Sequence, residues 1–223
     1  MPRGASGASA PPRSAEPEVR RRLVAAATRL FAERGYEASS VSDIVAAAGV
    51  TKGSLYHYFQ AKDDLLVEIY NRVLARLLDR LDRLANGPGT PVDRLRAVAV
   101  DLVVSTLERL DESVVFARSM HLLAPATGTA VRARWRRYHE RFRSLVEDGQ
   151  GAGLLRTDVS ADLAVRFFLG TVQQVSSWYR PDGAWNATQV GNGFAQLLID
   201  GLLPLPGGSG DRSVKRTDWS VTS

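Results

Sequence analysis

Apolar residues recur at intervals of three and four along most of this chain, and no long stretch alternates apolar with polar residues. The first run covers residues 18–34, where one face of a helix carries Leu23, Ala26, Ala27, Leu30 and Phe31. Such spacing is typical of amphipathic helices, whereas half-buried strands alternate. The sequence therefore predicts an all-α protein.

Two short helices follow, and the residues around them predict where they start and stop. Ser40 and Asp43 have the spacing of a capping box, so a second helix is expected to begin at Ser40 and to end at Gly49. Thr51 is a suitable N-cap for a third helix over Lys52–Phe59. Two helices this short, joined by a glycine turn, indicate a helix-turn-helix that the first helix must cover, because such helices are unstable alone.

The rest of the chain is expected to form further helices with short connections, as in a helical bundle. They are predicted over residues 62–85, 91–110, 112–123, 127–149, 160–180 and 187–203. Residues 1–17 and 204–223 are rich in glycine, serine and proline and are expected to be disordered. The predicted organisation is a three-helix domain over 18–62 and a second helical domain over 63–203.

Composition narrows the chemistry that the chain can carry. It has no cysteine, and three histidines leave few residues for a metal site or a catalytic triad. No G-x-S-x-G motif marks a nucleophile, so we expect neither an enzyme nor a metal or cofactor. No run reaches the ~18 to 20 apolar residues of a membrane span, and the N-terminus lacks the apolar core of a signal peptide. A cytoplasmic protein without a membrane partner is expected.

The start of the third helix carries the residues expected to read DNA. In a helix-turn-helix the second helix of the pair lies in the major groove, with its N-terminal residues facing base edges. Here those residues are Thr51, Lys52, Gly53 and Ser54. Lys52 can donate to guanine O6 and N7, and Gly53 leaves room for close approach of the backbone.

Four flanking side chains suit contacts outside that helix start. Tyr56 and His57 lie one turn further along and can reach a phosphate or a thymine methyl group. Lys62 and Ser40 stand at the starts of the neighbouring helices, where main-chain amides also favour phosphate. Seven basic and six acidic residues between 18 and 65 give little net attraction to DNA, and a dimer would double the contacts. On spacing alone, a three-helix packing unit without DNA fits equally well.

Residues 30–66, LFAERGYEASSVSDIVAAAGVTKGSLYHYFQAKDDLL, resemble the TetR family of bacterial transcriptional repressors. The residues that fit in register include Gly35, Asp43-Ile44, Gly49-Val50, Leu55-Tyr56, Tyr58-Phe59 and Lys62. The resemblance implies an N-terminal DNA-binding domain, a variable helical ligand domain, and a homodimer built mainly from the helices over 160–180 and 187–203. It also implies base contacts at 51–54 and contacts of Tyr56 and Lys62 with backbone phosphates.

The most basic stretch of the chain lies in the second domain. Residues 131–143, VRARWRRYHERFR, hold six arginines and one glutamate. On a helix, Trp135, Tyr138 and Phe142 share one face, so the arginines wrap a half-buried helix. They form either a solvated face or an opening for an anionic ligand, because guanidinium groups match phosphate geometry.

Polar residues interrupt the apolar pattern of the helix expected over 160–180. Buried polar groups need partners, so they either bond a neighbour or line a pocket. The run WYRPDG and its flanks, within residues 166–191, resemble TetR-family regulators of fatty-acid and sterol-ring catabolism, which respond to acyl-CoA thioesters. The candidate ligand-binding residues are Phe116, Trp135, Tyr138, Phe167, Gln173, Gln174 and Trp178. Each of the aromatic residues also fits an ordinary core.

The function that follows is a ligand-responsive transcriptional repressor. It binds a palindromic operator as a dimer, and a small molecule releases it by repositioning the helix over 62–85. The resemblance implies an acyl-CoA thioester as the effector. Two alternatives stay open: the same repressor with a hydrophobic drug or aromatic metabolite as inducer, or an architectural DNA-binding protein without a ligand.

Overall fold

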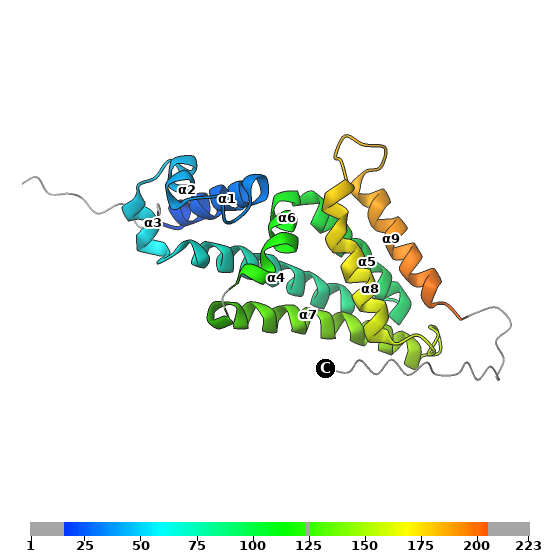
Figure 1. Cartoon of the computed structure of the whole chain (residues 1–223). Coiled ribbons are helices and arrows are strands. Elements are labelled where there is room, and N and C mark those ends of the chain that lie inside the picture. The colour runs from blue at the N-terminus through cyan, green and yellow to red at the C-terminus, as the bar shows by residue number, and fades with distance from the viewer. Residues whose placement is uncertain (1–15, 124, 205–223) are drawn as a thin grey trace, which may run out of the picture.

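The computed structural model describes residues 16–123 and 125–204, and this part of the chain is built from helices without strands (Figure 1). The all-α prediction is therefore confirmed. In chain order the elements are α1 (Glu16–Arg34), α2 (Val41–Ala48), α3 (Lys52–Tyr58), α4 (Lys62–Ala85), α5 (Pro91–Glu108), α6 (Leu110–Ser119), the 3-10 helix η1 (Met120–Leu122), α7 (Pro125–Gly151), α8 (Ala161–Trp178) and α9 (Ala187–Leu202).

Several predicted helix boundaries differ from those observed, and two of the differences have a local explanation. The first helix begins at Glu16, inside the predicted tail, because a proline such as Pro17 is tolerated in the first turn of a helix. The break between α5 and α6 falls at Arg109 rather than at Asp111, since Arg109 has the non-helical angles φ −131° and ψ 56°. The predicted disorder of residues 1–15 and 205–223 lies outside the described residues.

Local interactions fix the two short helices α2 and α3. The Ser40 hydroxyl accepts a hydrogen bond from the Asp43 amide at 3.1 Å, and the Asp43 carboxylate accepts one from the Ser40 amide at 3.0 Å. Gly49 ends α2 in the left-handed conformation with φ +63°, and the Arg22 guanidinium donates to two carbonyl oxygens at this turn. Leu55, fully buried, seats α3 in the core that it shares with α1 and α2.

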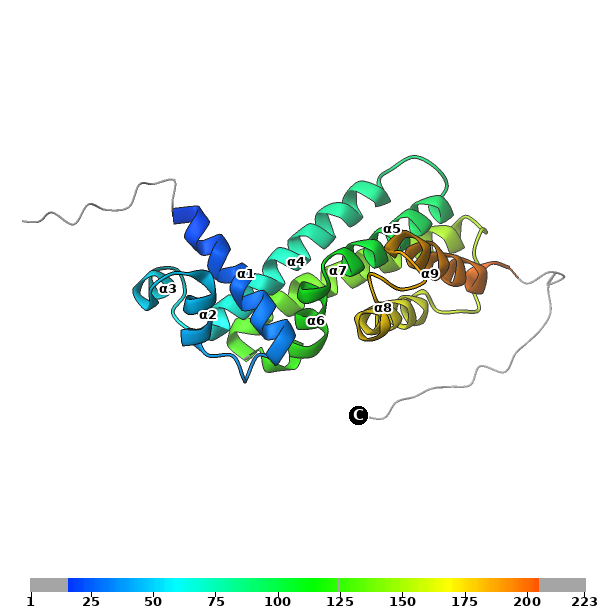
Figure 2. The same ribbon diagram turned by 90° about the horizontal axis from the view of Figure 1, so that it is seen from above.

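Buried apolar side chains form two cores, and α4 runs through both (Figure 2). The N-terminal core joins α1, α2, α3 and the first half of α4 as far as Leu74, with contributions from α6 and α7. The C-terminal core joins α5, α7, α8 and α9 with Leu81 and Ala85 at the end of α4. Trp135 of α7 packs against both cores. The domain boundary predicted between residues 62 and 63 stays a prediction, because the packing continues across it.

In the C-terminal core, α5 contacts α9, α7, α4 and α8. The contact between α5 and α9 depends on Gly191, where a Cβ atom would lie 2.9 Å from Val104 Cγ2 and 3.2 Å from the Val100 carbonyl oxygen. A glycine there lets the two helices approach closely. Within residues 16–123 and 125–204, none of the helices is both long and apolar enough to cross a membrane.

Candidate functional sites

The N-terminal end of α3 projects from the N-terminal core. Thr51 caps this helix, its hydroxyl accepting from the Ser54 amide at 3.2 Å and lying 3.0 Å from the Ser54 hydroxyl. Lys52 and Gly53 are exposed beside this cap, and Tyr56 is 55% exposed one turn further. The exposed His57 also lies on this helix, its ring 4.9 Å from that of Tyr58. The structure thus brings the predicted residues 51–57 together on one accessible helix.

Gly53 has no packing reason within the chain to be glycine. A Cβ atom built there would meet nothing nearer than the Thr51 hydroxyl oxygen, at 3.7 Å. Glycine also lowers helix stability by roughly 0.5–1 kcal/mol relative to alanine. The packing of the described residues therefore gives no reason for glycine at this position.

Ser40 and Lys62 are both engaged in holding the fold. The Ser40 hydroxyl donates to the Asp43 carboxylate at 2.6 Å, and these bonds hold the pKa of Asp43 below its usual range. The Lys62 ammonium donates to the carbonyl oxygens of Tyr36 at 2.9 Å and Ser39 at 3.0 Å, and lies 4.2 Å from the centre of the Tyr36 ring. Lys62 therefore ties the connection between α1 and α2 to the start of α4, a role that the sequence did not reveal.

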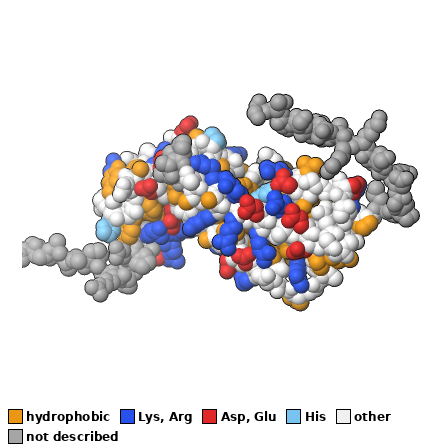
Figure 3. All heavy atoms as spheres, turned by 90° about the horizontal axis from the view of Figure 1, so that it is seen from below, with side chains coloured by type: hydrophobic (Ala, Val, Ile, Leu, Met, Phe, Trp, Pro, Cys, Tyr) orange, Lys and Arg blue, Asp and Glu red, His pale blue; other side chains and the backbone are white. Residues whose placement is uncertain are grey.

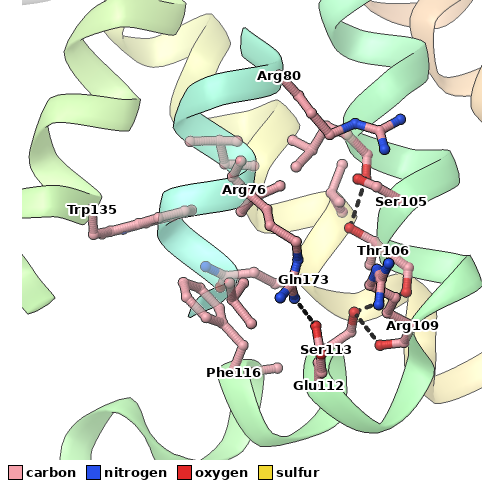
Figure 4. Close-up of a pocket in the computed structure, with 16 residues that line it drawn as sticks. Arg76, Arg80, Ser105, Thr106, Arg109, Glu112, Ser113, Phe116, Trp135 and Gln173 are labelled. Carbon is pink, nitrogen blue, oxygen red and sulfur yellow. Dashed lines mark hydrogen bonds and ion pairs between the residues drawn. The ribbon is translucent and has the colours of Figure 1, made fainter. Parts of the chain in front are cut away.

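A pocket lies between α4, α5, α6, α7 and α8, beside the point where the two cores meet (Figure 4). Its cavity volume is about 90 Å³. Trp135 and Phe116 stand at one end, and Figure 4 shows Arg109, Thr106 and Ser113 toward the other. The remaining apolar wall is made of Val73, Leu77, Leu102, Leu169 and Val172. The pocket thus has an apolar end and a polar end.

Three arginines and one glutamate line the pocket. Arg76 is paired with Glu112, and Arg80 with Asp101, whose two carboxylate oxygens accept from Arg80 Nε at 2.9 Å each. Burial lowers the pKa of Arg76, and the carboxylate of Glu112 opposes this effect. Arg109 has no ion-pair partner among the described residues. The polar end therefore carries an excess of positive charge.

The predicted ligand-binding residues are only partly brought together. Phe116, Trp135 and Gln173 line the pocket. Tyr138 lies behind its wall, 1% exposed, with its ring stacked on Trp135 at 5.7 Å between centroids. The structure thus keeps Tyr138 in the core.

Phe167, Gln174 and Trp178 do not line this pocket, so the structure does not bring them together with the other candidates, and their role in ligand binding stays a prediction. Phe167 is 74% exposed and Trp178 44% exposed, and Gln174 is exposed as well. The reason is that α8 is apolar on two opposite sides, so that periodicity alone did not tell which side faced inward. The inward side carries Leu169 and Val172, which line the pocket.

The arginine-rich helix α7 does not supply the pocket's arginines. Arg134 donates to Asn71 at 2.9 Å, and Arg141 donates to Asp82 at 3.1 Å, both across to α4. Figure 3 shows basic side chains interspersed with acidic ones on the side of the molecule seen from below. These contacts favour the solvated-face interpretation, in which the arginines hold α7 on α4.

An exposed apolar stripe runs along α8 and α9. It includes Leu163 and Phe167 on α8 and Leu197 on α9, with relative exposures of 62%, 74% and 74%. Gly170 and Gly193 lie on the same helices, and a Cβ atom at either would meet nothing within 4 Å. Exposed apolar area of this kind is typical of a surface that another molecule covers.

Comparisons with known proteins place the chain in a family. Residues 23–69 match the family of bacterial regulatory proteins described as the tetR family, and residues 88–202 match the tetracyclin repressor-like C-terminal domain. The HTH-type transcriptional repressor KstR2 of Rhodococcus jostii is 32% identical over 189 residues, covering 82% of this chain and 90% of that protein.

Two solved structures agree with this result. The ketosteroid transcriptional regulator KstR2 of Mycobacterium tuberculosis superposes with a TM-score of 0.76 at 26% identity, covering 90% of this chain and 100% of that one. AibR, solved in complex with isovaleryl coenzyme A and operator DNA, superposes with a TM-score of 0.74 at 29% identity, covering 81% of this chain and 98% of that one. The chain therefore belongs to the TetR family and is a DNA-binding transcriptional repressor rather than an enzyme.

Proposed function

We propose that this repressor binds a palindromic operator as a homodimer and that an acyl-CoA thioester releases it. The observation that carries the proposal is the pocket with an apolar end and an arginine-rich end, set beside the junction of the two cores. A ligand bound there contacts α4, whose other half supports the helix-turn-helix. The effector and the operator thus act on the two ends of one helix.

The DNA end of the proposal assigns base contacts to residues 51–54. Lys52 donates to guanine O6 and N7, and Gly53 permits the close approach that its lack of packing neighbours leaves open. Tyr56 and His57 then contact phosphates or thymine methyl groups. Lys62 contacts a backbone phosphate with the one ammonium hydrogen that its two carbonyl bonds leave over. Ser40 contacts a phosphate by turning its single hydroxyl hydrogen from the Asp43 carboxylate to the phosphate oxygen. Half-site centres are expected about 10 base pairs apart, or a multiple of that.

Gly53→Ala tests this assignment with two readouts that move in opposite directions. The variant should be as stable as the wild type or more stable, because the added methyl group meets no neighbour and alanine favours the helix. Its affinity for a duplex selected with the wild-type protein from a randomised pool should fall. Unchanged duplex binding in a stable variant would remove α3 from the interface.

The homodimer is assigned to the exposed stripe of α8 and α9. Phe167→Asp combined with Leu197→Asp should give a monomer by light scattering, because both side chains are largely exposed in the single chain and a charge there opposes burial. Asn192→Asp is a matched control, since this exposed residue lies on another side of α9. A dimer that survives the double substitution would contradict this assignment.

The effector is assigned to a CoA thioester because one pocket holds both an apolar end and paired and unpaired arginines. An acyl group suits the end formed by Trp135 and Phe116, and phosphate groups suit guanidinium groups. The relative AibR was solved with isovaleryl coenzyme A, which supports the same class of ligand. A cavity of about 90 Å³ requires its walls to move for a larger acyl group.

A thermal-shift series tests the effector class. The series contains CoA thioesters of different acyl length, free CoA, and the same acyl groups on N-acetylcysteamine, which carries no phosphate. A thioester at a hundred times its Kd should stabilise the protein by about 2.7 kcal/mol. Preference for the uncharged thioesters would favour a hydrophobic drug or aromatic metabolite as inducer. No ligand response, together with sequence-independent and steeply salt-dependent DNA binding, would favour an architectural protein.

A further inference from the structure

The ion pair between Arg76 and Glu112 stands between two cavities. Arg76, Glu112 and Arg109 line the pocket, and the same three residues also line a larger cleft of about 730 Å³. That cleft runs between α1 and α6, where Val24 and Thr28 of α1 form part of its wall. The pair is therefore a shared wall between the effector pocket and a cleft that borders the first helix of the DNA-binding unit.

This pair is also the one ion pair that joins α4 to α6 among the described residues. Further along α6, the Tyr70 hydroxyl of α4 donates to the carbonyl oxygens of Val115 at 3.1 Å and Phe116 at 2.9 Å. Glu112 lies in the first turn of α6, which follows the non-helical residue Arg109. The ion pair thus ties the start of α6 to α4, where the Ser113 hydroxyl also donates to the Thr106 carbonyl of α5 at 2.8 Å, while the later turns of α6 are tied to α4 by Tyr70.

Movement at the start of α6 has a direct route to the DNA-binding unit, because α6 packs against α1. The surroundings of Arg76 favour a second anion. Arg72 and Arg109 both act on Arg76 as like charges, and Arg109 has no carboxylate of its own within the described residues. Figure 4 shows Arg76 reaching from α4 toward Glu112, with Arg109 also lining this pocket.

We propose that Arg76 exchanges partners: it pairs with Glu112 in the operator-binding form, and with an anionic group of the effector, assisted by Arg109, in the released form. The exchange frees Glu112 and with it the start of α6, so that the contact of α6 with α1 changes. This inference rests on the proposed function, because it names the residues through which an anionic effector acts. It also predicts that the effector's negative charge, and not only its acyl group, is needed for release.

Glu112→Gln tests the exchange, with Asp101→Asn as a matched control. Both substitutions neutralise the carboxylate partner of a pocket arginine, but Asp101 joins α4 to α5 within the C-terminal core. Without any effector, Glu112→Gln should weaken binding to the selected duplex by about 5-fold, the lower end of typical coupling between sites. It should bind isovaleryl-CoA more tightly by a similar factor, since the competing carboxylate is gone. Asp101→Asn should leave binding to the duplex unchanged, because the pair of Arg80 and Asp101 joins α4 to α5 and does not involve α6.

A second measurement does not depend on any substitution. The isovaleryl thioester of N-acetylcysteamine should leave the wild-type protein on the duplex at concentrations where isovaleryl-CoA releases it. If CoA thioesters release the wild type but Glu112→Gln behaves like the control, or if the uncharged thioester releases equally well, the exchange is wrong and the proposed function stands. If no CoA thioester binds the wild type, the proposed function fails and the exchange fails with it.

Discussion

The two ends of α4 lie in units that are specified in different ways. Around the first end, the helix-turn-helix is set by neighbours in sequence: Ser40 caps α2, Thr51 caps α3, and Gly49 makes the turn between them. Around the other end, the pocket is assembled from five helices, and its ion pairs join residues 21 and 36 positions apart. The geometry of the unit that binds DNA is thus determined by contacts between residues close in sequence. The geometry of the unit that binds a ligand is determined by packing between residues far apart in sequence.

The sharpest test of that contrast is whether the two units unfold separately. Phe142 is fully buried in the C-terminal core, so Phe142→Ala should destabilise the protein by about 3–5 kcal/mol. Because α4 and Trp135 belong to both cores, the substitution should lower the stability of the helix-turn-helix as well. Urea unfolding followed by circular dichroism and by tryptophan fluorescence should show one transition. The result that would contradict this expectation is two separate transitions, of which the substitution shifts only the one that belongs to the C-terminal core. The two units would then be independent.

Two lysines distinguish reading DNA from holding the fold. Lys52→Ala should cost about 1–3 kcal/mol in binding to the preferred duplex and should relax one base preference, with stability unchanged. Lys62→Met should weaken binding to all duplexes alike and should also lower the stability, because two carbonyl oxygens lose a charged donor worth roughly 1.5–3 kcal/mol per bond. Duplex titrations and urea unfolding of both variants measure this difference. Equal profiles for the two lysines would contradict it.

The cap of the recognition helix should have a smaller effect. Thr51→Ala removes the oxygen that accepts from the Ser54 amide, and this should cost about 1 kcal/mol of stability. Thr51→Ser keeps that oxygen and serves as the control. Thermal unfolding of the two variants compares them, and a Thr51→Ala protein as stable as Thr51→Ser would show that the cap does not hold α3.

The smallest expected effect is a pH dependence located in the C-terminal unit. Burial lowers the pKa of His139, Asp162 opposes this shift, and Arg166 and Arg143 add to it. An unfolded chain, with a histidine pKa of about 6.5, then binds a proton that the folded chain does not. The free energy of unfolding should therefore fall as the pH drops from above 6.5 toward the pKa of His139 in the folded protein, which is lower than 6.5. Below that pKa the contribution of His139 should no longer change with pH. Melting temperatures of wild type and His139→Gln across this range measure the effect, and parallel profiles would contradict it.

These contrasts explain what the sequence could and could not predict. The caps at Ser40 and Thr51 were predictable because donor and acceptor lie three residues apart. Arg76 and Glu112 were not, because no local pattern pairs residues from two separate helices. Phe167 does not line the pocket, because α8 is apolar on both sides and this side chain lies on the exposed one. Lys62 looked like a phosphate ligand, and its two carbonyl partners emerge only from the folding of α1 onto α4.

Calorimetric titration of isovaleryl-CoA into the free repressor, and into the repressor saturated with its selected duplex, tests most directly whether pocket and recognition helix are linked. We expect the duplex to weaken binding of the thioester by about 5-fold or more, and the thioester to weaken binding of the duplex by the same factor. Equal affinity for the thioester with and without duplex would contradict the linkage through α4.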